Sequence, residues 1–579
     1  MEKSKEKTKK IASKVEPKKV VKKENVKKTV ATKKTATKTT AVKKVATPKT
    51  IAKKVVKKEE TKKVPAKTTA KKSTVKKVAE PKAVVSKVMP KVTVSKVEQK
   101  EKQKVLFVVS ECQPFCATGG LADVAGGLPK YISKNSNFDV RVMLPMYSSI
   151  PQEYRKDFKF LGNTNIPLAW RSIYCGVFSY ELDGVTYYFL DNESYFKRDG
   201  IYSYYDDGER FAFTSRAVLQ VLPIINYYPD ILHCNDWQFA LVPVYLKTHY
   251  ANNNAYNKIK TIFTCHNSEY QGRFELKSIS DLFGIDSKYT SMLEYNKELN
   301  LVKGAVIACD KFTTVSPTYA QEIISDAETS NGLDPILREH KDKIVGILNG
   351  VDYEFYNPKT DKALFKNYDV KTFKVKKDNK LALQKQYGLN EDENAPMISI
   401  VTRMAKHKGL DLIKASFEGL LNQHPTLQLV IVGNGTYEYE QYFKYLQEKF
   451  AGRVKTALGY SNKEARKAYA ASDIFVMPSK AEPCGISQMI ASRYGAIPIV
   501  RETGGLKDSI KDFGCEGGGN GYTFANYNTN DFIYSINRAL KDFEDKTSWA
   551  EKIKICMNKD FSWNVSAKEY ANLYADLLK

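Results

Sequence analysis

Residues 104–130 read KVLFVVSECQPFCATGGLADVAGGLPK. The stretch begins with the apolar run Val105–Val109, passes through a turn containing Thr118-Gly119-Gly120, and then shows apolar residues at helical spacing over Leu121–Ser133. A strand, a glycine-rich turn and a helix in this order are typical of the first unit of a wound α/β domain. We therefore expect a mainly parallel sheet with helices on both of its faces.

The same alternation continues outward from this unit. Further strand-like runs lie at 140–144, 185–190, 231–233, 261–265 and 312–315. After a polar, lysine-rich stretch that ends near Asn394 the pattern restarts, with runs at 397–401, 427–432, 454–457, 474–477 and 497–500. The restart predicts two successive Rossmann-like domains that face a cleft. Ligands of such sheets bind beyond the carboxyl ends of the strands, so we expect the site in that cleft.

Four segments follow from this organisation. We expect an arm at 1–103, an N-terminal Rossmann-like domain at 104–352 and a C-terminal Rossmann-like domain at 353–557. The last segment, 558–579, is expected to form a helix that packs back on the N-terminal domain.

The formal charge of +27 is distributed very unevenly. Residues 1–100 hold 34 Lys and 8 Glu with no Arg or Asp, a net charge of +26, and the remaining residues carry only +1. The arm also lacks Phe, Tyr, Trp, Gly and Cys, so it cannot bury enough apolar surface to offset its ordering entropy, and disorder is predicted. Any general affinity for polyanions is therefore expected in the arm and not in the body.

The compartment follows from what the sequence lacks. No apolar segment of a secretory signal follows Met1–Lys10, the arm has no Arg typical of transit peptides, and no run of about 18 apolar residues could span a membrane. The nine cysteines are odd in number and scattered through apolar runs, which predicts reduced thiols and a cytoplasmic protein. Cys112 and Cys116 have no second Cys/His pair at ligand spacing, which argues against a metal site.

Two motifs of the second domain could bind parts of a nucleotide sugar, one its diphosphate and the other its sugar hydroxyls. Arg403 and Lys408 follow its first strand, where two fixed cations could neutralise a diphosphate; a solvated basic loop is the alternative. Glu482 lies in the loop Pro478–Gln488, just before an expected helix, where a carboxylate could hold sugar hydroxyls.

Three glycine-rich turns fit contact with a nucleotide or an anion, but each also fits an ordinary strand-end turn. They are Thr118-Gly119-Gly120, Gly433-Asn434-Gly435 and Gly459-Tyr460, the last with an aromatic ring that could stack on a base.

Together these residues resemble a known family. Residues 104–579 are similar to bacterial glycogen synthases and plant starch synthases, the retaining GT-B glucosyltransferases. The resemblance is carried by residues 104–130 and by DDGERFAFTSRA, HCNDWQFALVPVYLK, HNSEYQG, GILNGVD, RMAKHKGLDLI, EPCGISQ and RETGGLKDSI. It implies transfer of glucose from ADP-glucose to the non-reducing end of an α-1,4-glucan such as glycogen. The N-terminal domain would then serve the acceptor and the C-terminal domain would bind the nucleotide sugar.

The resemblance also implies roles for particular residues. Arg403 and Lys408 would stabilise the diphosphate, and Glu482 would hold the transferring glucose. The donor would be bound by Thr118, Gly119, Gly120, Tyr460, Cys484, Gly485, Ser487 and Gln488. The sugar and acceptor side would be lined by His266, Asn267, Asp207 and Gln238.

Two positions depart from the family pattern. Ala117 stands where the family usually has Lys before Thr-Gly-Gly, and Gln238 stands where His usually follows Asp-Trp. The first removes a cation near the donor phosphates, and the second removes a side chain that could become cationic. The chain contains no Asp-x-Asp, the usual pattern of a metal-dependent transferase, so we expect no metal and no cofactor.

Two alternatives remain open on the sequence alone. One is a related GT-B glucosyltransferase that uses UDP-glucose. The other is a polyanion-binding protein whose lysine-rich arm carries the function and whose transferase body has decayed.

Overall fold

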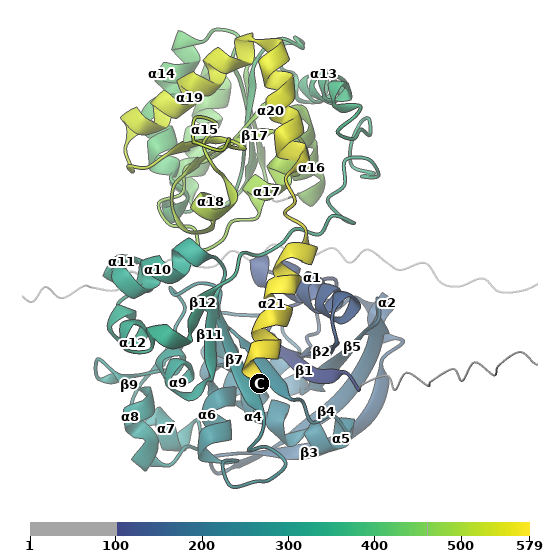
Figure 1. Cartoon of the computed structure of the whole chain (residues 1–579), viewed down its shortest axis with the longest axis vertical. Helices are drawn as coiled ribbons and strands as arrows, with labels where there is room; N and C mark the ends of the chain where they lie inside the picture. The colour runs from purple at the N-terminus through teal and green to yellow at the C-terminus, as the bar shows by residue number, and fades with distance from the viewer. Residues whose placement is uncertain (1–100, 460) are drawn as a thin grey trace, which may run out of the picture. The chain divides into compact units, whose positions relative to one another are not determined.

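The structure is a computed structural model that describes residues 101–459 and 461–579. In the described residues, two sheets flanked by helices follow one another along the chain (Figure 1). The lysine-rich arm at 1–100 and Tyr460 lie outside these residues, so the predicted disorder of the arm is not addressed by the fold.

The first sheet has nine strands in the order β12-β11-β7-β6-β1-β2-β5-β4-β3. Their bounds are β1 Gln103–Val108, β2 Phe138–Pro145, β3 Lys159–Leu168, β4 Arg171–Leu182, β5 Val185–Asp191, β6 Ile231–Asn235, β7 Lys260–Cys265, β11 Lys311–Thr314 and β12 Ile344–Gly346. All neighbours are parallel except β3, β4 and β5, which pair antiparallel at one edge. The predicted parallel sheet is confirmed, and the antiparallel edge was not expected.

The second sheet has six parallel strands in the order β15-β14-β13-β16-β17-β18. Their bounds are β13 Met397–Val401, β14 Gln428–Gly433, β15 Val454–Leu458, β16 Ile474–Met477, β17 Ile497–Arg501 and β18 Tyr522–Phe524. Strand β13 lies between β14 and β16, so the loops that follow these three strands emerge side by side at one edge of the sheet.

Helices flank both sheets. Those of the first part are α1 Gly120–Asn135, α4 Asp207–Gln220, α6 Leu241–Thr248, α9 Leu301–Ala308, α10 Pro317–Ser325 and α12 Asp334–Glu339. Short helices lie between them: α2 Gln152–Arg155, α3 Glu193–Phe196, α5 Leu222–Ile225, α7 Ser278–Asp281, α8 Thr290–Leu293 and α11 Ala327–Ser330. Those of the second part are α13 Lys376–Tyr387, α14 Leu410–Gln423, α15 Tyr437–Lys449, α16 Asn462–Ala471, α17 Ser487–Arg493, α18 Gly504–Ser509, α19 Thr529–Glu544 and α20 Lys546–Asn558. A small sheet of β8 Arg273–Phe274, β10 Glu298–Asn300 and β9 Glu294–Tyr295 lies between α6 and α9 in sequence.

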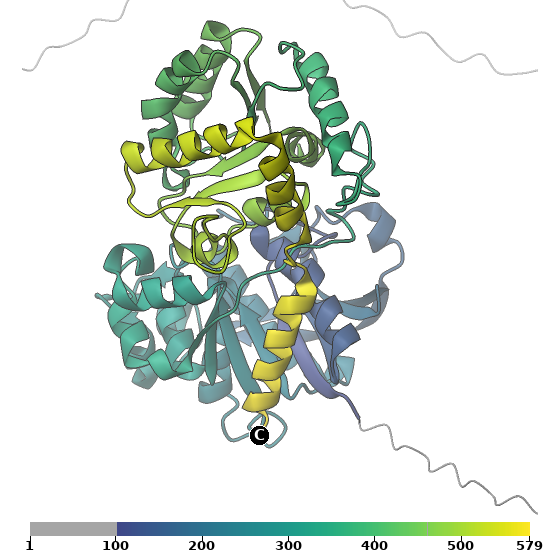
Figure 2. The ribbon, with the colours of Figure 1, turned by 45° about the horizontal axis from the view of Figure 1, so that its top comes forward.

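The last helix, α21 (Trp563–Leu577), returns to the first sheet and lies beside α1 (Figures 1 and 2). Glycines make room for its first residue: a Cβ built on Gly127 would come within 2.2 Å of the Trp563 ring, and one on Gly350 within 2.7 Å of its backbone. Further along α21, the hydroxyl of Tyr574 lies 2.7 Å from Nδ1 of His233 on β6.

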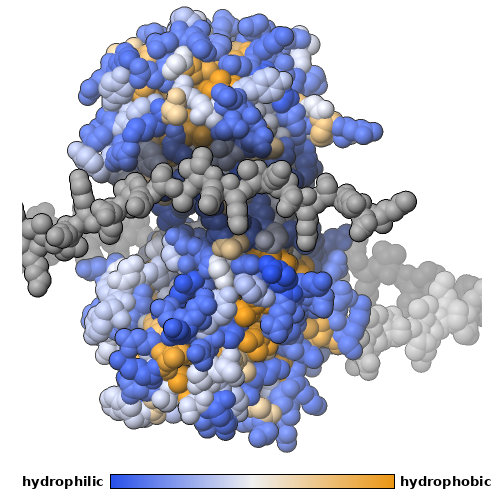
Figure 3. All heavy atoms as spheres, turned by 90° about the vertical axis from the view of Figure 1, so that its left-hand side faces the viewer, coloured by the Kyte–Doolittle hydropathy of each residue, from blue (hydrophilic) through white to orange (hydrophobic). Residues whose placement is uncertain are grey.

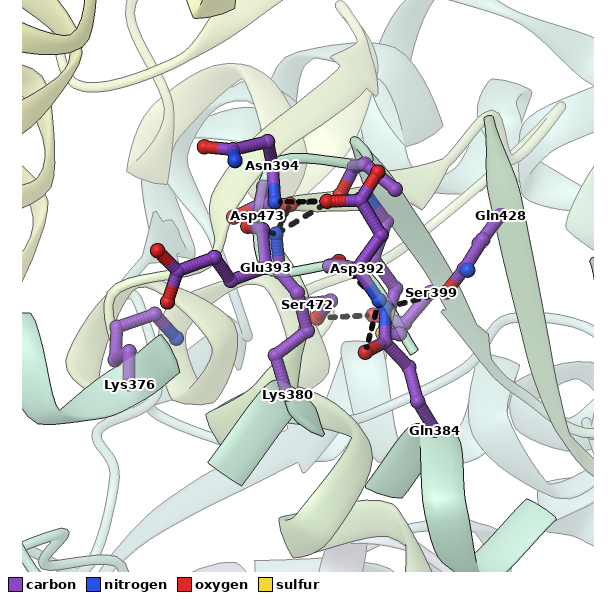
Figure 4. Close-up of polar contacts among 12 residues, drawn as sticks. Lys376, Lys380, Gln384, Asp392, Glu393, Asn394, Ser399, Gln428, Ser472 and Asp473 are labelled. Carbon is purple, nitrogen blue, oxygen red and sulfur yellow. Dashed lines mark hydrogen bonds and ion pairs between the residues drawn. The ribbon is translucent and has the colours of Figure 1, made fainter. Parts of the chain in front are cut away.

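Helix α13 holds the amino-terminal edge of the second sheet through a buried polar cluster (Figure 4). Lys380 forms an ion pair of 2.6 Å with Asp473, and the same carboxylate accepts the backbone N–H of Met397, the first residue of β13. Lys376 donates to three backbone carbonyl groups at the ends of α16 and α17. Since Asp473 directly precedes β16, the cluster fixes the starts of the two strands whose opposite ends carry the candidate site.

The surface drawn in Figure 3 is mostly hydrophilic, with hydrophobic residues in small separate groups. No helix of the described residues is long and apolar enough to cross a membrane.

Candidate active site

Glu482 and Lys408 come together at the carboxyl-terminal edge of the second sheet. Lys408 Nζ donates to Glu482 Oε2 at 2.6 Å, and Ser479 Oγ donates to the same oxygen at 3.0 Å. The pair is 74 residues apart in sequence, and it forms because β13 and β16, which precede the two loops, are parallel neighbours. Among the described residues no hydrogen bond reaches Glu482 Oε1, so one carboxylate oxygen is fixed by the protein and the other is available to a ligand.

Arg403 lies in the same loop as Lys408 and is exposed, without an ion pair in the part of the chain that the structure describes. Its loop is held against the turn Gly433-Asn434-Gly435, because Met404 N donates to Asn434 O at 2.7 Å. Both glycines are needed at this contact: a Cβ on Gly433 would lie 1.9 Å from Thr402 O. Two cations with positions set by neighbouring strands can therefore face an anion at this edge.

The side chain of Gln488 supports the loop around Cys484 by hydrogen bonds to the loop backbone. The side-chain amide of Gln488 donates to Cys484 O at 3.3 Å, Gly485 O at 2.9 Å and Ser509 Oγ at 3.0 Å, and the residue is fully buried. The Cys484 side chain is also buried, which raises the pKa of its thiol to about 12. The side chains of Cys484 and Gln488, expected around the sugar and phosphates, thus face the protein interior and support the loop.

Gly485 and Ser487, in contrast, are partly exposed. Gly485 has a φ of +73°, and a Cβ there would lie 2.7 Å from Gln488 Oε1, so the turn requires glycine. Ser487 is the first residue of α17. Next to it, Ile486 approaches the turn of the first part of the chain, since a Cβ on Gly120 would lie 3.9 Å from Ile486 Cδ1.

The turn Thr118-Gly119-Gly120 carries an internal anion that the sequence reasoning missed. The buried carboxylate of Glu111 accepts from Thr118 N, from Thr118 Oγ1 at 2.8 Å and from Gly119 N at 3.0 Å. Two N–H groups expected to face the donor are therefore occupied by Glu111. Burial raises the pKa of this carboxyl group against those hydrogen bonds. The signal was the position of Glu111, directly after the first strand and before the glycines.

Ala117 is exposed immediately before this turn, at the position where the resemblance led us to expect Lys. The turn therefore encloses the buried Glu111 carboxylate, and its own residues include no cation.

His266 lies close to the Glu111 turn, in the loop after β7. Its Nε2 lies 2.9 Å from Asn235 Oδ1, and its backbone N–H donates to Asp236 Oδ1 at 2.8 Å. Burial lowers the pKa of His266 to about 4, with a smaller opposing effect of Glu111, so the ring is neutral near pH 7. Asp236, a second residue not expected from the sequence, is half-buried directly after β6, and desolvation raises its pKa to about 7.

The other three residues expected on the sugar side differ in how free they are. Asn267 forms a local turn, accepting the Glu269 N–H at 3.0 Å. Gln238 is buried and its Oε1 has no hydrogen-bond partner, so it retains an acceptor. Asp207 is engaged in the protein: it pairs with the buried Arg210 at 2.8 Å and accepts the Ser203 N–H at 2.9 Å. Its carboxylate organises the start of α4.

Tyr460, expected to pack on a base, lies outside the described residues. No group of three or more His, Cys, Asp or Glu side chains that could hold a metal occurs in residues 101–459 and 461–579. Cys112 and Cys116 form a backbone-bonded turn with both side chains buried.

Comparison with known protein families identifies the family to which the chain belongs. The family of starch synthase catalytic domains matches residues 104–339, and the family glycosyl transferases group 1 matches residues 383–555. A glycogen synthase of Bacillus cytotoxicus is 46% identical over 478 residues, which cover 82% of this chain and 99% of the relative. The chain belongs to the glycogen and starch synthase family.

Another curated relative and a solved structure match the chain in the same family. A glycogen synthase of Anoxybacillus flavithermus is also 46% identical, over 82% of this chain and 98% of its own length. The catalytic domain of starch synthase IV from Arabidopsis thaliana, solved with ADP and acarbose, superposes with a TM-score of 0.76 at 33% identity, over 82% of this chain and 99% of that one. The predicted GT-B fold with two Rossmann-like domains is confirmed.

Proposed function

We propose that this chain transfers glucose from ADP-glucose to the non-reducing end of an α-1,4-glucan with retention of configuration. The observation that carries the proposal is the pairing of Lys408 with Glu482 at 2.6 Å, in the same loop as Arg403, which has no ion pair within residues 101–459 and 461–579. The related starch synthase IV catalytic domain was solved bound to ADP and acarbose.

Each charged residue has a part in this reaction. As the bond to the diphosphate breaks, negative charge grows on the leaving group, and Arg403 and Lys408 stabilise it. Glu482 accepts hydrogen bonds from glucose hydroxyls through the oxygen that the protein leaves unpaired. Two fixed cations can do what a metal does in other transferases, so we propose a reaction without metal or cofactor.

On the acceptor side, the groups we propose for glucan hydroxyl groups are the neutral His266 and the amide oxygen of Gln238, which is buried and without a hydrogen-bond partner among the described residues. A neutral imidazole and an amide suit uncharged sugar, because neither must give up an ion pair to bind it.

The donor is tested by measuring glucose incorporation into glycogen from ADP-glucose and from UDP-glucose at equal concentrations. We expect a higher kcat/KM with ADP-glucose. A preference for UDP-glucose would favour the related GT-B activity instead.

We also propose that the arm at 1–100 binds polyanions without specificity, on the basis of its net charge of +26. Lysine without arginine or aromatic residues suits phosphate contacts and offers no base stacking. Binding of duplex DNA by the full chain should weaken steeply with salt, and residues 104–579 should not bind. Tight binding by the body alone would contradict this assignment.

The cysteines support a cytoplasmic location as part of the same proposal. All nine are unpaired, and eight of them are buried. Free thiols in this number are typical of a reducing compartment.

A further inference from the structure

Helices α10 and α18 pack against each other although they follow strands of different sheets. Helix α10 follows β11 of the first sheet, and α18 follows β17 of the second. Each helix receives a carboxylate from the other at its first turn.

Asp508, on α18, binds the first turn of α10. Thr318 donates its backbone N–H to Asp508 Oδ2 at 2.8 Å and its hydroxyl to Oδ1 at 2.6 Å. Both carboxylate oxygens are therefore used, one by the backbone and one by the side chain of the same residue. Such charge-assisted bonds at the start of a helix are stronger than bonds between neutral groups.

Glu322, on α10, completes the reciprocal arrangement. It accepts the Gly504 N–H at 3.0 Å and 3.2 Å through its two oxygens, and the Thr503 hydroxyl at 3.1 Å. The two carboxylates thus point in opposite directions along one helix pair. Neither set of bonds can persist unless α10 and α18 keep this separation and register.

The helix pair is connected directly to the loop that carries Glu482. Gly505 N lies 3.2 Å from both Glu482 O and Pro483 O, and Ser316, the N-cap of α10, donates its hydroxyl to Pro483 O at 2.7 Å. A Cβ on Gly504 would lie 2.0 Å from Glu482 O, so the start of α18 touches the Glu482 backbone. Moving α18 relative to α10 would therefore move the catalytic loop.

We propose that Glu322 and Asp508 are positioning residues whose reciprocal bonds, the α10–α18 clasp, hold the Glu482 loop in the arrangement required for glucose transfer. Neither residue touches the reacting atoms. The clasp connects the Glu482 loop, which follows β16 of the second sheet, to the part of the chain that contains the first sheet and the Thr118–Gly120 turn.

The clasp should act on the transfer step more than on nucleotide binding. Arg403 and Lys408 follow β13, and none of the clasp's hydrogen bonds reaches β13, so we expect the contribution of these two cations to the affinity for ADP to be largely kept. The position of the Glu482 side chain, in contrast, depends on the backbone of Glu482 and Pro483, which is hydrogen-bonded to α18 and to Ser316. Loss of the clasp therefore relaxes the group that orients glucose while the cations stay in place.

The test compares the full-length chain with Glu322→Gln and Asp508→Asn, which keep the side-chain shape and remove the charge. We expect kcat for glucose transfer to glycogen to fall about tenfold in each, which corresponds to the loss of one charge-assisted hydrogen bond. The Kd for ADP, measured by calorimetry, should change less than about twofold. The double variant should lose little more than either single variant, because both belong to one clasp.

Glu328→Gln is the matched control. Glu328 pairs with Lys480 at 2.5 Å across the same interface, but both side chains are exposed, and such pairs contribute little. Its kcat should stay at the wild-type value. Wild-type kcat in Glu322→Gln and Asp508→Asn would overturn the proposal. So would an equal loss in the control, a hundredfold loss in the double variant, or a fall in kcat accompanied by weaker ADP binding and a lower Tm.

This inference rests on the proposed transferase activity. The two fail differently: a wild-type chain with no transfer from either donor would remove the proposed function. An active wild-type chain with unaffected variants would remove only the clasp.

Discussion

Lys408 donates to the Glu482 oxygen that also accepts the Ser479 hydroxyl, so its ammonium group is a fixed point of the loop as well as the proposed stabiliser of the diphosphate. Replacement by alanine leaves the Glu482 carboxylate, which is 7% exposed, without its cation. We expect Lys408→Ala to lower kcat by about a hundredfold or more, the usual loss when one group that stabilises transition-state charge is removed. Steady-state kinetics with ADP-glucose and glycogen measure this, with Lys406→Ala in the same loop as the control.

Ala117 permits the opposite experiment, a gain of function. The turn that follows it holds the Glu111 carboxylate and no cation, so a lysine at 117 would add a positive charge beside the donor phosphates. We expect Ala117→Lys to lower the KM for ADP-glucose by about threefold to tenfold, in proportion to one exposed charge contact of about 1 kcal/mol.

The neutral variant Ala117→Gln is the control, and its KM should match the wild type. An unchanged KM in Ala117→Lys would mean that Arg403 and Lys408 already supply all the charge that the donor requires.

At this scale the sequence predicted which residue types gather, but not how each is used. Lys408 and Glu482 were expected at one edge because each follows a strand of a parallel sheet, and their contact at 2.6 Å confirms that proximity. The roles of these two residues and of Arg403 stay predictions. Gln488 was expected at the ligand, yet its amide supports the loop, because orientation within a helical turn depends on packing that no motif records. Glu111 was missed because its role depends on the fold of a turn seven residues away.

Among the elements, α21 is joined to the first sheet by the bond between Tyr574 and His233. Both side chains are buried, and the other His233 nitrogen lies 2.6 Å from Thr264 Oγ1. Tyr574→Phe leaves a buried imidazole nitrogen without a partner. We expect a loss of about 1–3 kcal/mol in the free energy of unfolding, measured by denaturant titration. Tyr534→Phe, on an exposed ring of α19, should have no effect.

The same histidine predicts a pH dependence of stability. Burial, and to a lesser degree His266, lowers the pKa of His233 from 6.5 to about 3. Below about pH 6.5 the unfolded chain therefore binds a proton that the folded chain does not, so this residue makes stability fall as the pH drops from about 6.5 toward 3. The slope attributable to one such group is about 1.4 kcal/mol per pH unit.

The measurement compares the wild type with His233→Gln between pH 5 and pH 7. The variant should show a shallower decline in the free energy of unfolding, whereas His424→Asn, on the partly exposed histidine at the end of α14, should leave the slope unchanged. Parallel curves for the wild type and His233→Gln would contradict a neutral, buried imidazole.

Element positions were largely readable because buried parallel strands are short apolar runs between turns. The helix expected at 121–133 is α1 at Gly120–Asn135, and the strand expected at 397–401 is β13 without change. The antiparallel pairing of β3 with β4 was not predicted from the sequence. Strand β3 is an edge strand in which only Ile166 and Leu168 are buried. An edge strand with few buried positions lacks the apolar run by which the other strands were found.

For the whole molecule, the charge distribution separates the arm from the catalytic body. The relatives align with 478 residues of this chain over 98–99% of their own length, and the body carries a net charge of only +1. We therefore expect residues 104–579 and the full chain to have the same kcat on glycogen. A large loss on removing the arm would show that the arm takes part in catalysis.

We infer that this chain is an ADP-glucose-dependent glucan synthase whose chemistry depends on the carboxylate of Glu482. The most direct test follows radiolabelled glucose from ADP-glucose into glycogen, with the full-length wild type and with Glu482→Gln, after both are shown to fold and to bind ADP. We predict incorporation by the wild type and a loss of about a hundredfold or more in the variant. No incorporation by the folded wild type, or equal incorporation by both, would contradict the account.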